Sequence, residues 1–215
     1  MEISLKNIIP IPLKENLEKR PSEVWHNTVR IDPTSRVKIK APSGTGKTTL
    51  IHYLYRMRSD YTGTISWDGQ DLRQLDSDRL AGYRQQKISI IFQDLRLFAQ
   101  LTARENIELN RVLQTPHYPA EAIDEMAGQL QVDHILHQPA GICSYGEQQR
   151  IAIIRALVQP FSLLIMDEPF SHLDKQNARK AAQLIEAECD RRGAGFVLTD
   201  LDEDDFFTYN TFLTL

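Results

Sequence analysis

The chain has 215 residues, with 29 acidic against 25 basic side chains and a formal net charge of −4. This length fits one elaborated domain with a large core, and the lack of a basic excess argues against nucleic acid as a partner. Cys143 and Cys189 have no further ligand at metal-binding spacing, so we interpret them as reduced thiols of a cytosolic protein.

The N-terminal segment is not typical of a secretory signal. Its short apolar stretch is interrupted by Pro10 and Pro12, and no small-residue cleavage site follows. No apolar run along the chain approaches the length of about 18 residues that a membrane-spanning helix needs. We therefore expect a cytoplasmic protein, which would need a separate partner to act across a membrane.

The first third of the chain predicts a β layer followed by a strand, loop and helix. Residues 3–13 and 24–31 are rich in β-branched and apolar residues, with charged, Pro-containing segments between them. Residues 36–40 alternate as a strand does, and a Gly-rich turn leads from them into an apolar helix over 48–57. Residues 62–72 are rich in turn formers and predict a turn.

Three further apolar segments, 87–92, 162–166 and 195–199, predict buried strands. Together with 36–40, and with helical segments between them, they indicate a largely parallel α/β sheet. Between about 94 and 145 the pattern becomes helical and predicts an inserted helical subdomain. The acidic run 202–205 is expected to be a solvated helix start.

The segment APSGTGKTT, residues 41–49, has the context of a phosphate-binding loop because it follows a strand and opens a helix. Its glycines let backbone N–H groups turn toward phosphate oxygens, and the helix N-terminus adds partial positive charge. Lys47 is expected to pair with the β- and γ-phosphates, and the Thr48 hydroxyl to ligate Mg²⁺. An ordinary Gly-rich turn is the alternative, and Ala41 departs from the motif's first Gly. The expected nucleotide-binding residues are Pro42, Ser43, Gly44, Thr45, Gly46, Lys47, Thr48 and Thr49.

The segment SLLIMDEP, residues 162–169, is a predicted buried strand that ends in two carboxylates. It would place charge at the carboxyl edge of a parallel sheet, where ligands bind. Asp167 is expected to hold Mg²⁺, directly or through water, and Glu168 to act as general base toward the attacking water. Such a run alone is often merely a strand end, but the phosphate loop upstream favours the functional interpretation.

Together with three further segments in order, these motifs make the chain resemble the ABC ATPase family over nearly its whole length. IIFQD places Gln93 at the family's Q-loop, CSYGEQQR (143–150) is similar to its signature motif, and SHLD (171–174) to its D-loop. The resemblance implies an α/β fold: a P-loop NTPase core with an N-terminal antiparallel β layer and an inserted α-helical subdomain. Residues 1–215 would form one ABC ATPase domain, in which about 94–145 interrupts a core of 1–93 and 146–215.

The resemblance also implies an ATPase that uses ATP and Mg²⁺ and dimerises, as a homodimer or with another ABC ATPase. Ser144 and Gly146 of one subunit would meet the γ-phosphate held by the other, and Gln93 would contact Mg²⁺ or the lytic water. The chain would drive an integral membrane permease-like subunit while bound peripherally to the inner face of the cell membrane. The alternative is a slow or inactive regulatory or scaffold subunit; soluble uses of the fold are a further one.

Residues 84–109 are especially similar to the subfamily that serves lipoprotein release, macrolide export and the cell-division cassette complex. In those systems a short helix of the membrane partner lies in a groove beside the Q-loop. Leu95, Leu97 and Phe98 could line such a groove here, although apolar residues at this spacing belong more often to a core.

Three departures from the family pattern touch the nucleotide site. Tyr145 and Cys143 stand where the signature has Gly and usually Leu, and Asp200 occupies or neighbours the place of the family's γ-phosphate-sensing His. The adenine-contacting region, 8–13, offers no aromatic ring; Ile11 and Pro12 can pack on a base but stack less well, and Trp25 lies too close to the following strand to be the expected substitute. We expect a less tightly closed dimer, low basal turnover and modest discrimination between ATP and GTP. His172, in the D-loop segment, is expected to be a surface or interface residue.

Overall fold

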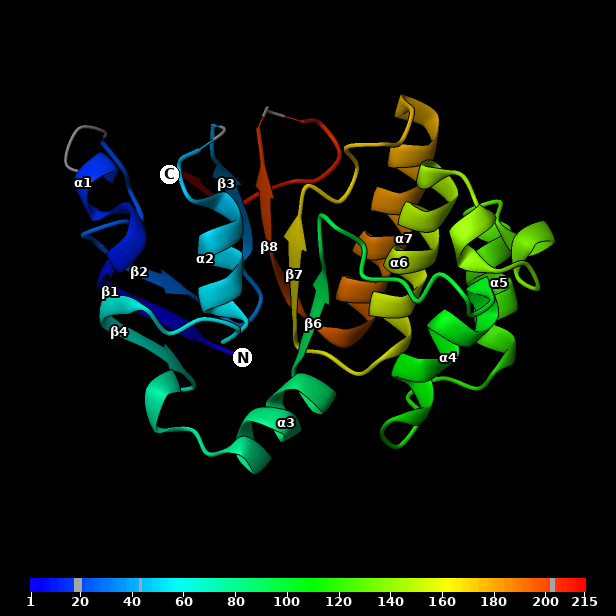
Figure 1. Cartoon of the computed structure of the whole chain (residues 1–215), viewed down its shortest axis with the longest axis horizontal. Helices are drawn as coiled ribbons and strands as arrows, with labels where there is room; N and C mark the ends of the chain where they lie inside the picture. The colour runs from blue at the N-terminus through cyan, green and yellow to red at the C-terminus, as the bar shows by residue number, and fades with distance from the viewer. Residues whose placement is uncertain (18–20, 43, 202–203) are drawn as a thin grey trace.

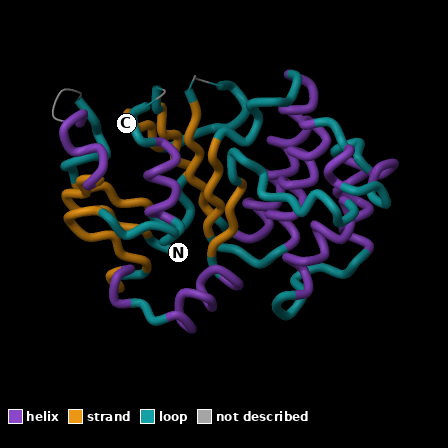
Figure 2. Tube along the Cα trace, viewed as in Figure 1, coloured by secondary structure: helices purple, strands orange, loops and turns teal. Residues whose placement is uncertain are grey.

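The computed structural model describes residues 1–17, 21–42, 44–201 and 204–215. Two sheets enclose α2 (Lys47–Leu54), and a group of helices covers the far face of the second sheet, as Figures 1 and 2 show. The first sheet is antiparallel, in the order β2 (Thr28–Ile31), β1 (Ile3–Pro10), β4 (Tyr61–Trp67) and β5 (Gln70–Asp71). The second is parallel, in the order β6 (Ile88–Ile91), β7 (Leu163–Asp167), β8 (Gly195–Asp200), β3 (Arg36–Lys40) and β9 (Thr211–Thr214). This arrangement confirms the predicted fold class.

The remaining elements are helical. The α-helices are α1 (Lys14–Leu17), α3 (Ser77–Gln86), α4 (Ala103–Val112), α5 (Glu121–Gln129), α6 (Tyr145–Val158) and α7 (Lys175–Arg192). The short 3₁₀ segments are η1 (Ile11–Leu13), η2 (Leu72–Gln74), η3 (Asp133–Ile135) and η4 (Ala140–Ile142). In the described part of the chain, no helix is both long enough and apolar enough to cross a bilayer.

The parallel sheet lies between two hydrophobic cores because successive side chains of a strand point to opposite faces. In β7, Leu163 and Ile165 belong to the core shared with α2 and the antiparallel sheet. Leu164 and Met166 belong to the core formed with α4 to α7. Burial on both faces explains why this strand is a continuous apolar run, as the sequence predicts.

The turn predicted over 62–72 is wrong, because most of this segment forms β4. Ile65 and Trp67 are fully buried and pair with Leu5 and Ile3 of β1. Gly63, which suggested a turn, has a φ of 83°, and a Cβ there would lie 2.3 Å from a carbonyl oxygen of β1. The glycine therefore permits a close approach of two strands inside the sheet.

Two other expectations need correction. β2 begins at Thr28, so the predicted strand 24–31 was too long. The predicted helix start at 202–205 lies partly outside the described residues, and its described part is not helical. Asp204 is not solvated either, since its side chain is 7% exposed and pairs with Lys38. In addition, the sequence did not indicate β9, which forms an edge of the parallel sheet.

The connection from the Q-loop to α4 is held by one buried side chain, Asn106. Its Oδ1 accepts a hydrogen bond from the Phe98 N–H at 2.8 Å, and its Nδ2 lies 3.0 Å from the Phe98 carbonyl oxygen. The same Nδ2 lies 3.2 Å from the Leu101 carbonyl oxygen and 3.0 Å from that of Thr102. The three carbonyl oxygens also accept backbone N–H groups, whereas the Phe98 N–H has the Asn106 side chain as its printed partner, so this one amide completes the hydrogen bonding of the loop.

We expect Asn106→Ala to lower the free energy of unfolding by about 3 kcal/mol, because it leaves the Phe98 N–H without its partner and removes the amide's bonds to three carbonyl oxygens. Urea denaturation followed by circular dichroism measures the change. Asn110→Ala, one turn further along α4, is the matched control: its half-buried amide has a single short bond, at 2.9 Å to Gln159, so we expect a loss of about 1 kcal/mol. Equal losses in the two variants would contradict the role of Asn106.

Candidate active site

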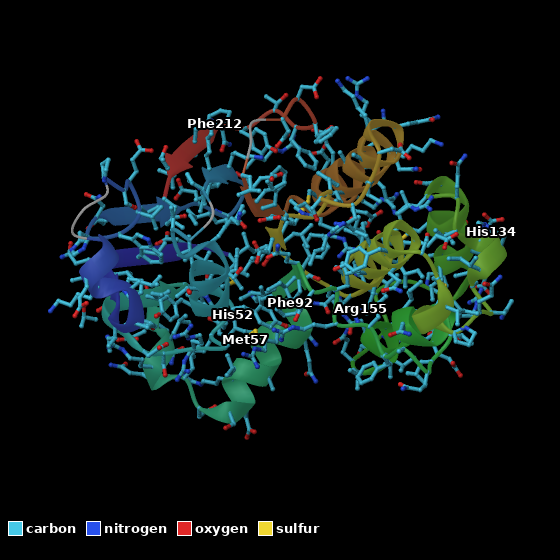
Figure 3. The ribbon with its side chains drawn as sticks, turned by 45° about the horizontal axis from the view of Figure 1, so that its top comes forward. His52, Met57, Phe92, His134, Arg155 and Phe212 are labelled. Atoms are coloured by element: carbon cyan, nitrogen blue, oxygen red, sulfur yellow. The ribbon has the colours of Figure 1, made fainter. Side chains whose placement is uncertain are left out.

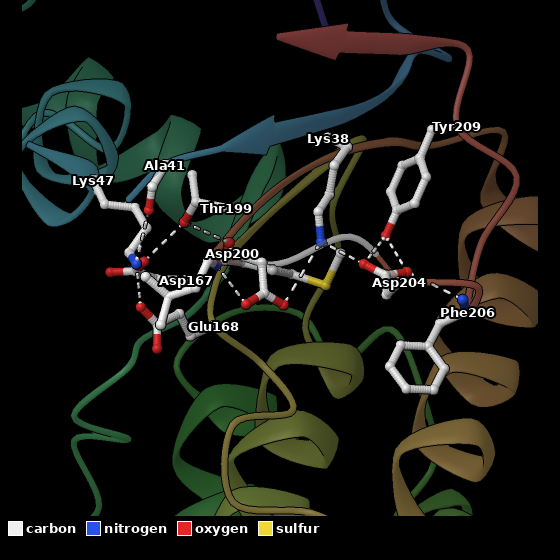
Figure 4. A network of polar contacts seen from close by, with 12 residues as sticks. Lys38, Ala41, Lys47, Asp167, Glu168, Thr199, Asp200, Asp204, Phe206 and Tyr209 are labelled. Atoms are coloured by element: carbon white, nitrogen blue, oxygen red, sulfur yellow. Dashed lines mark hydrogen bonds and ion pairs between the residues drawn. The ribbon is translucent and has the colours of Figure 1, made fainter. Parts of the chain in front are cut away.

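Three strands bring their carboxyl ends to one edge of the parallel sheet. β3 ends before Ala41, β7 ends at Asp167 and β8 ends at Asp200. The Ala41 N–H donates to the Asp200 carbonyl oxygen at 2.9 Å, and the Glu168 N–H donates to the Thr199 carbonyl oxygen at 3.0 Å. Backbone hydrogen bonds thus join the end of β8 to the start of the phosphate loop and to the segment that carries the two carboxylates (Figure 4).

The phosphate loop has the backbone form that its glycines predict. Gly44 and Gly46 have φ values of 80° and 97°, in the left-handed region that favours glycine. A Cβ on Gly44 would touch nothing within 4 Å, so backbone conformation alone requires glycine there. Thr45 folds back on the loop, with its hydroxyl 2.8 Å from the Pro42 carbonyl oxygen. Ser43 lies outside the described residues, Pro42 and Thr48 are exposed, and Thr49 is half-buried at the start of α2.

Trp25 supports this loop from within. It is 1% exposed, and its indole N–H donates to the Thr45 carbonyl oxygen at 3.2 Å. A Cβ on Gly46 would lie 3.3 Å from the Trp25 ring and 2.7 Å from Leu13. The covered ring cannot stack on a base, so Trp25 does not replace the adenine-contacting aromatic, as its closeness to the strand indicated. Ile11, in contrast, is 58% exposed. A buried tryptophan needs a hydrogen-bond partner for its indole N–H, and for Trp25 this partner is the phosphate loop.

Lys47 and Glu168 form a buried ion pair at the centre of the edge. The Lys47 ammonium also donates to the Ala41 carbonyl oxygen at 3.3 Å. The amide of Gln93 donates to the other carboxylate oxygen of Glu168 at 3.4 Å. The site therefore brings together the phosphate-loop lysine, the expected general base and the Q-loop amide.

The backbone of Glu168 is strained, with a φ of 46° in the left-handed region. A side chain other than glycine adopts this conformation at a cost and persists where its surroundings fix it. Here the N–H is bonded to Thr199, and the carbonyl oxygen accepts from the buried Gln149 amide at 3.3 Å. Gln149 also accepts from the His172 N–H at 3.0 Å, so one amide contacts both the Glu168 backbone and the D-loop segment.

Asp167 is buried beside the ion pair of Lys47 and Glu168. Its Oδ1 accepts from the Thr199 hydroxyl at 2.8 Å, and the Thr48 hydroxyl is a second partner. Burial raises the pKa of Asp167, and these two hydroxyls act in the opposite direction. A cavity of about 330 Å³ opens beside the carboxylate; its lining includes Thr48, Gln93 and Asp167, together with His52, Phe92, Asp94, Arg96, Tyr145 and His172.

The residues of this cavity fit a magnesium ion. A hydroxyl, a carboxylate and an amide oxygen are hard ligands of the kind that Mg²⁺ prefers, and Mg²⁺ commonly uses one or two carboxylates plus substrate phosphates. Thr48, Asp167 and Gln93 supply those three groups from α2, β7 and the Q-loop. The donor set is therefore compatible with the metal that the sequence predicts.

The signature segment caps α6. Ser144 accepts a hydrogen bond from the Glu147 N–H, and the Glu147 side chain accepts from the Ser144 N–H, forming a capping box. Tyr145 is not among the described residues with positive φ, so its backbone does not need a glycine. Gly146 lies against the D-loop segment, where a Cβ would be 3.2 Å from the His172 carbonyl oxygen. Ser144 and Gly146 thus lie at the N-terminus of α6, in contact with residues 172–173.

The Tyr145 side chain joins three motifs of the same chain. Its ring packs edge-on against His172, with ring centroids 4.1 Å apart. Its hydroxyl donates to the Gln93 carbonyl oxygen at 3.4 Å. His172 is exposed, as expected of a surface residue. Tyrosine at this position therefore links the signature segment to the D-loop and the Q-loop.

The apolar residues after the Q-loop do not line a groove together. Leu95 is 2% exposed and belongs to the core, Leu97 packs against the core beside α4 to α7, and Phe98 is 57% exposed. A separate cavity of about 330 Å³ lies beside the Q-loop, and its lining includes Tyr55, Phe92, Arg96, Leu113 and Arg155. Figure 3 labels two of these lining residues, Phe92 and Arg155. The lining of this cavity does not include Leu95, Leu97 or Phe98.

Sequence comparison relates the chain to ATP-binding proteins of ABC transporters. A family model described as ABC transporter matches residues 26–171. The lipoprotein-releasing system ATP-binding protein LolD of Geobacter metallireducens is 31% identical over 169 residues, which cover 78% of this chain and 75% of the relative. The macrolide export ATP-binding/permease protein MacB of Marinobacter nauticus is 32% identical over 179 residues, 82% of this chain but 28% of that protein. The glucose import ATP-binding protein GlcV of Saccharolobus solfataricus is 32% identical over 181 residues, 83% of this chain and 51% of the relative.

Solved structures agree. The dimeric structure of MJ0796, a bacterial ABC transporter cassette, superposes with a TM-score of 0.80 at 26% identity and covers 93% of this chain and 88% of that one. Its dimeric post-hydrolysis state bound to ADP and Pi gives a TM-score of 0.77 at the same identity and coverage. The family match spans more than half of the chain, and the fold and motif order agree with it: the chain belongs to the ABC transporter family.

Proposed function

We propose that this chain binds ATP with Mg²⁺ and hydrolyses it as the ATPase subunit of a membrane complex. The observation that carries the proposal is the convergence of Lys47, Gln93 and Glu168 on one buried contact beside the Asp167 carboxylate. The family relationship and the similarity to a cassette solved with ADP and Pi support the same function. Lys47 and Glu168 are both present, so the site offers no support for an inactive regulatory subunit.

The ion pair suggests how binding prepares the reaction. Lys47 now shares its charge between the Glu168 carboxylate and the Ala41 carbonyl oxygen. The β- and γ-phosphates compete for the same ammonium, and when Lys47 turns to them the Glu168 carboxylate becomes free to accept a proton from water. Thr48, Asp167 and Gln93 would hold Mg²⁺, which supplies charge neutralisation at the phosphate oxygens when bound. Pro42, Ser43, Gly44, Thr45, Gly46 and Thr49 would complete the nucleotide-binding loop.

A dimer completes the proposed site. The two MJ0796 structures are dimeric, and Ser144 and Gly146 stand at the N-terminus of α6, a 14-residue helix whose partial positive charge favours an anion. We propose that these residues meet the γ-phosphate held by the other subunit. That subunit is a second copy of this chain or another ABC ATPase.

A membrane protein is the proposed partner. LolD is named as part of a lipoprotein-releasing system, and MacB as an export ATP-binding/permease protein. The chain would act in the cytoplasm, bound to the inner face of the cell membrane through an integral membrane permease-like subunit. The cavity beside the Q-loop, whose lining combines arginine and amide side chains with Phe92 and the 65% exposed Leu113, supplies a surface for contact. Residues 1–215 would form one domain, with about 94–145 as its helical subdomain.

The first test removes the charge that binds phosphate. We expect Lys47→Ala to weaken ATP binding at least about tenfold, because the ammonium that pairs with the β- and γ-phosphates is lost. Isothermal titration calorimetry with ATP and Mg²⁺ measures the affinity. Lys87→Ala is the matched control, since Lys87 is exposed just before β6, at the opposite end of the sheet. Wild-type affinity in Lys47→Ala would refute the assigned phosphate loop.

The second test separates hydrolysis from binding. We expect Glu168→Gln to retain ATP, to slow turnover on the order of a hundredfold and to accumulate dimer, because the amide cannot accept the proton of the attacking water. Steady-state phosphate release and size-exclusion chromatography with ATP and Mg²⁺ report the two effects. Glu121→Gln, exposed in the first turn of α5, is the control. A Glu168→Gln variant that turns over like the wild type would exclude the general-base role.

The third test concerns the tyrosine in the signature segment. We expect Tyr145→Gly to raise ATP turnover several-fold, because it releases the Q-loop and D-loop from the ring and permits closer approach of the second subunit. Tyr145→Phe removes the hydroxyl contact but keeps the ring, so we expect a smaller increase. Phosphate release at saturating ATP distinguishes the variants. If Tyr145→Gly is no faster than the wild type, the ring does not restrain closure.

A further inference from the structure

The middle of β3 contains a buried positive charge. Lys38 is 1% exposed, although the strand residues on either side of it, Val37 and Ile39, belong to the apolar core shared with α2. Its ammonium forms an ion pair with Asp204 and lies 3.6 Å from Oδ2 of Asp200 (Figure 4). A buried ammonium is costly unless it is paired. The position of Lys38 is therefore tied to these two carboxylates.

Asp204 has a full set of its own partners. The Tyr209 hydroxyl lies 2.8 Å from each of its carboxylate oxygens, and the Phe206 N–H donates to Oδ1 at 3.0 Å. Burial, together with the neighbouring Asp204 carboxylate, raises the pKa of Tyr209, so its hydroxyl remains a donor. The Lys38 ammonium has three N–H groups and can serve a second carboxylate besides Asp204.

Asp200 is the carboxylate that lies closest to the phosphate loop in this network. Its carbonyl oxygen accepts from the Ala41 N–H, and it directly follows Thr199, the partner of Asp167. An ionised carboxylate at this edge repels the phosphates of a nucleotide. In the structure Oδ1 of Asp200 accepts from the Leu201 N–H at 2.7 Å, while Oδ2 faces Lys38.

We propose that Lys38 is a positioning residue for nucleoside triphosphate: it offsets the charge of Asp200 and keeps that carboxylate turned toward the interior of the protein, so that a γ-phosphate can enter. The inference rests on the proposed ATP-binding function. The role of Lys38 concerns the affinity for the γ-phosphate in particular. Asp200 lies at the end of β8, beside the Asp167 and Glu168 carboxylates, where the γ-phosphate is expected, and not beside α2. A diphosphate carries less charge to this edge.

The test compares the affinities of two nucleotides. We expect Lys38→Met, which keeps side-chain length and apolar packing, to weaken binding of the non-hydrolysable triphosphate AMP-PNP about tenfold and of ADP less than about twofold, because the uncompensated charge acts on the terminal phosphate. The double variant Lys38→Met/Asp200→Asn should return AMP-PNP affinity to within about twofold of the wild type. Calorimetric titrations with Mg²⁺ measure both affinities. Equal losses for the two nucleotides, or no recovery in the double variant, would overturn the proposal.

A second variant keeps the test decisive if Lys38→Met does not fold, which thermal melting by circular dichroism detects. In Asp204→Asn, the positive charge of Lys38 is left to offset Asp200 alone. We therefore expect the ratio of AMP-PNP affinity to ADP affinity to rise about threefold, whereas Lys38→Met should lower this ratio. Asp205→Asn, at an exposed position in the same loop, is the matched control. An unchanged ratio in Asp204→Asn would refute the charge sharing. A wild-type protein that binds neither nucleotide would overturn the proposed function as well, whereas normal binding without a triphosphate-specific effect overturns this inference alone.

Discussion

The pairing of β8 with both β3 and β7 is the constraint on which the site depends. Its register sets Lys40 against Asp200 and Asp167 against Thr199, so the phosphate loop and the carboxylates begin at the same height of the sheet. Parallel strands accumulate their carboxyl ends at one edge, where polar side chains can meet a ligand. No local preference of the loop or of the Asp-Glu pair would bring them together without this register.

The same register concentrates negative charge, and the chain offsets it with buried lysines. Lys47 pairs with Glu168, and Lys38 serves Asp204 and Asp200. Removing one partner of such a pair leaves an unpaired buried charge, which is more costly than the pair itself is favourable. The strained backbone of Glu168 belongs to the same arrangement, because contacts from Thr199 and Gln149 hold it in place. The carboxyl edge of the sheet therefore holds charged groups in place for charged ligands. This arrangement lowers the stability of the fold, and burial of apolar side chains in the two cores offsets that loss.

Sequence patterns predicted the parts of this arrangement that are local. The apolar run of β7 identified a buried strand and the alternation of β3 a strand, and the glycines of the phosphate loop predicted a turn, which has a left-handed backbone at Gly44 and Gly46. β4 was missed because Gly63 and the Asp-Gly pair after Trp67 have the composition of a turn, although one permits a strand contact and the other joins β4 to β5. β9 was missed because its residues are only partly buried, so no apolar run marks it.

The supporting residues of the site could not be found in the same way, because each depends on segments that are distant in sequence. Trp25 contacts the phosphate loop 20 positions later, and Lys38 meets a carboxylate 166 positions later. The residue types gave only partial signals: Lys38 is a polar position of an alternating strand, as a solvent-facing lysine would be, and Asp200 stands where the family has a His. These signals acquire a meaning once the fold shows that they face one another.

β9 illustrates how an inconspicuous element can fix the site. It pairs with β3 on the side away from β8, and beyond it the Leu215 N–H donates to the Lys40 carbonyl oxygen at 2.9 Å. Thr214 exchanges hydrogen bonds with Glu23, through its carbonyl oxygen at 2.8 Å and its N–H at 2.7 Å. Glu23 lies two residues before Trp25, whose indole holds the Thr45 carbonyl oxygen. The last strand thus anchors the segment that supports the phosphate loop, while the loop before it carries Asp204 and Tyr209. Both sides of the phosphate loop therefore depend on where β9 and the loop before it lie.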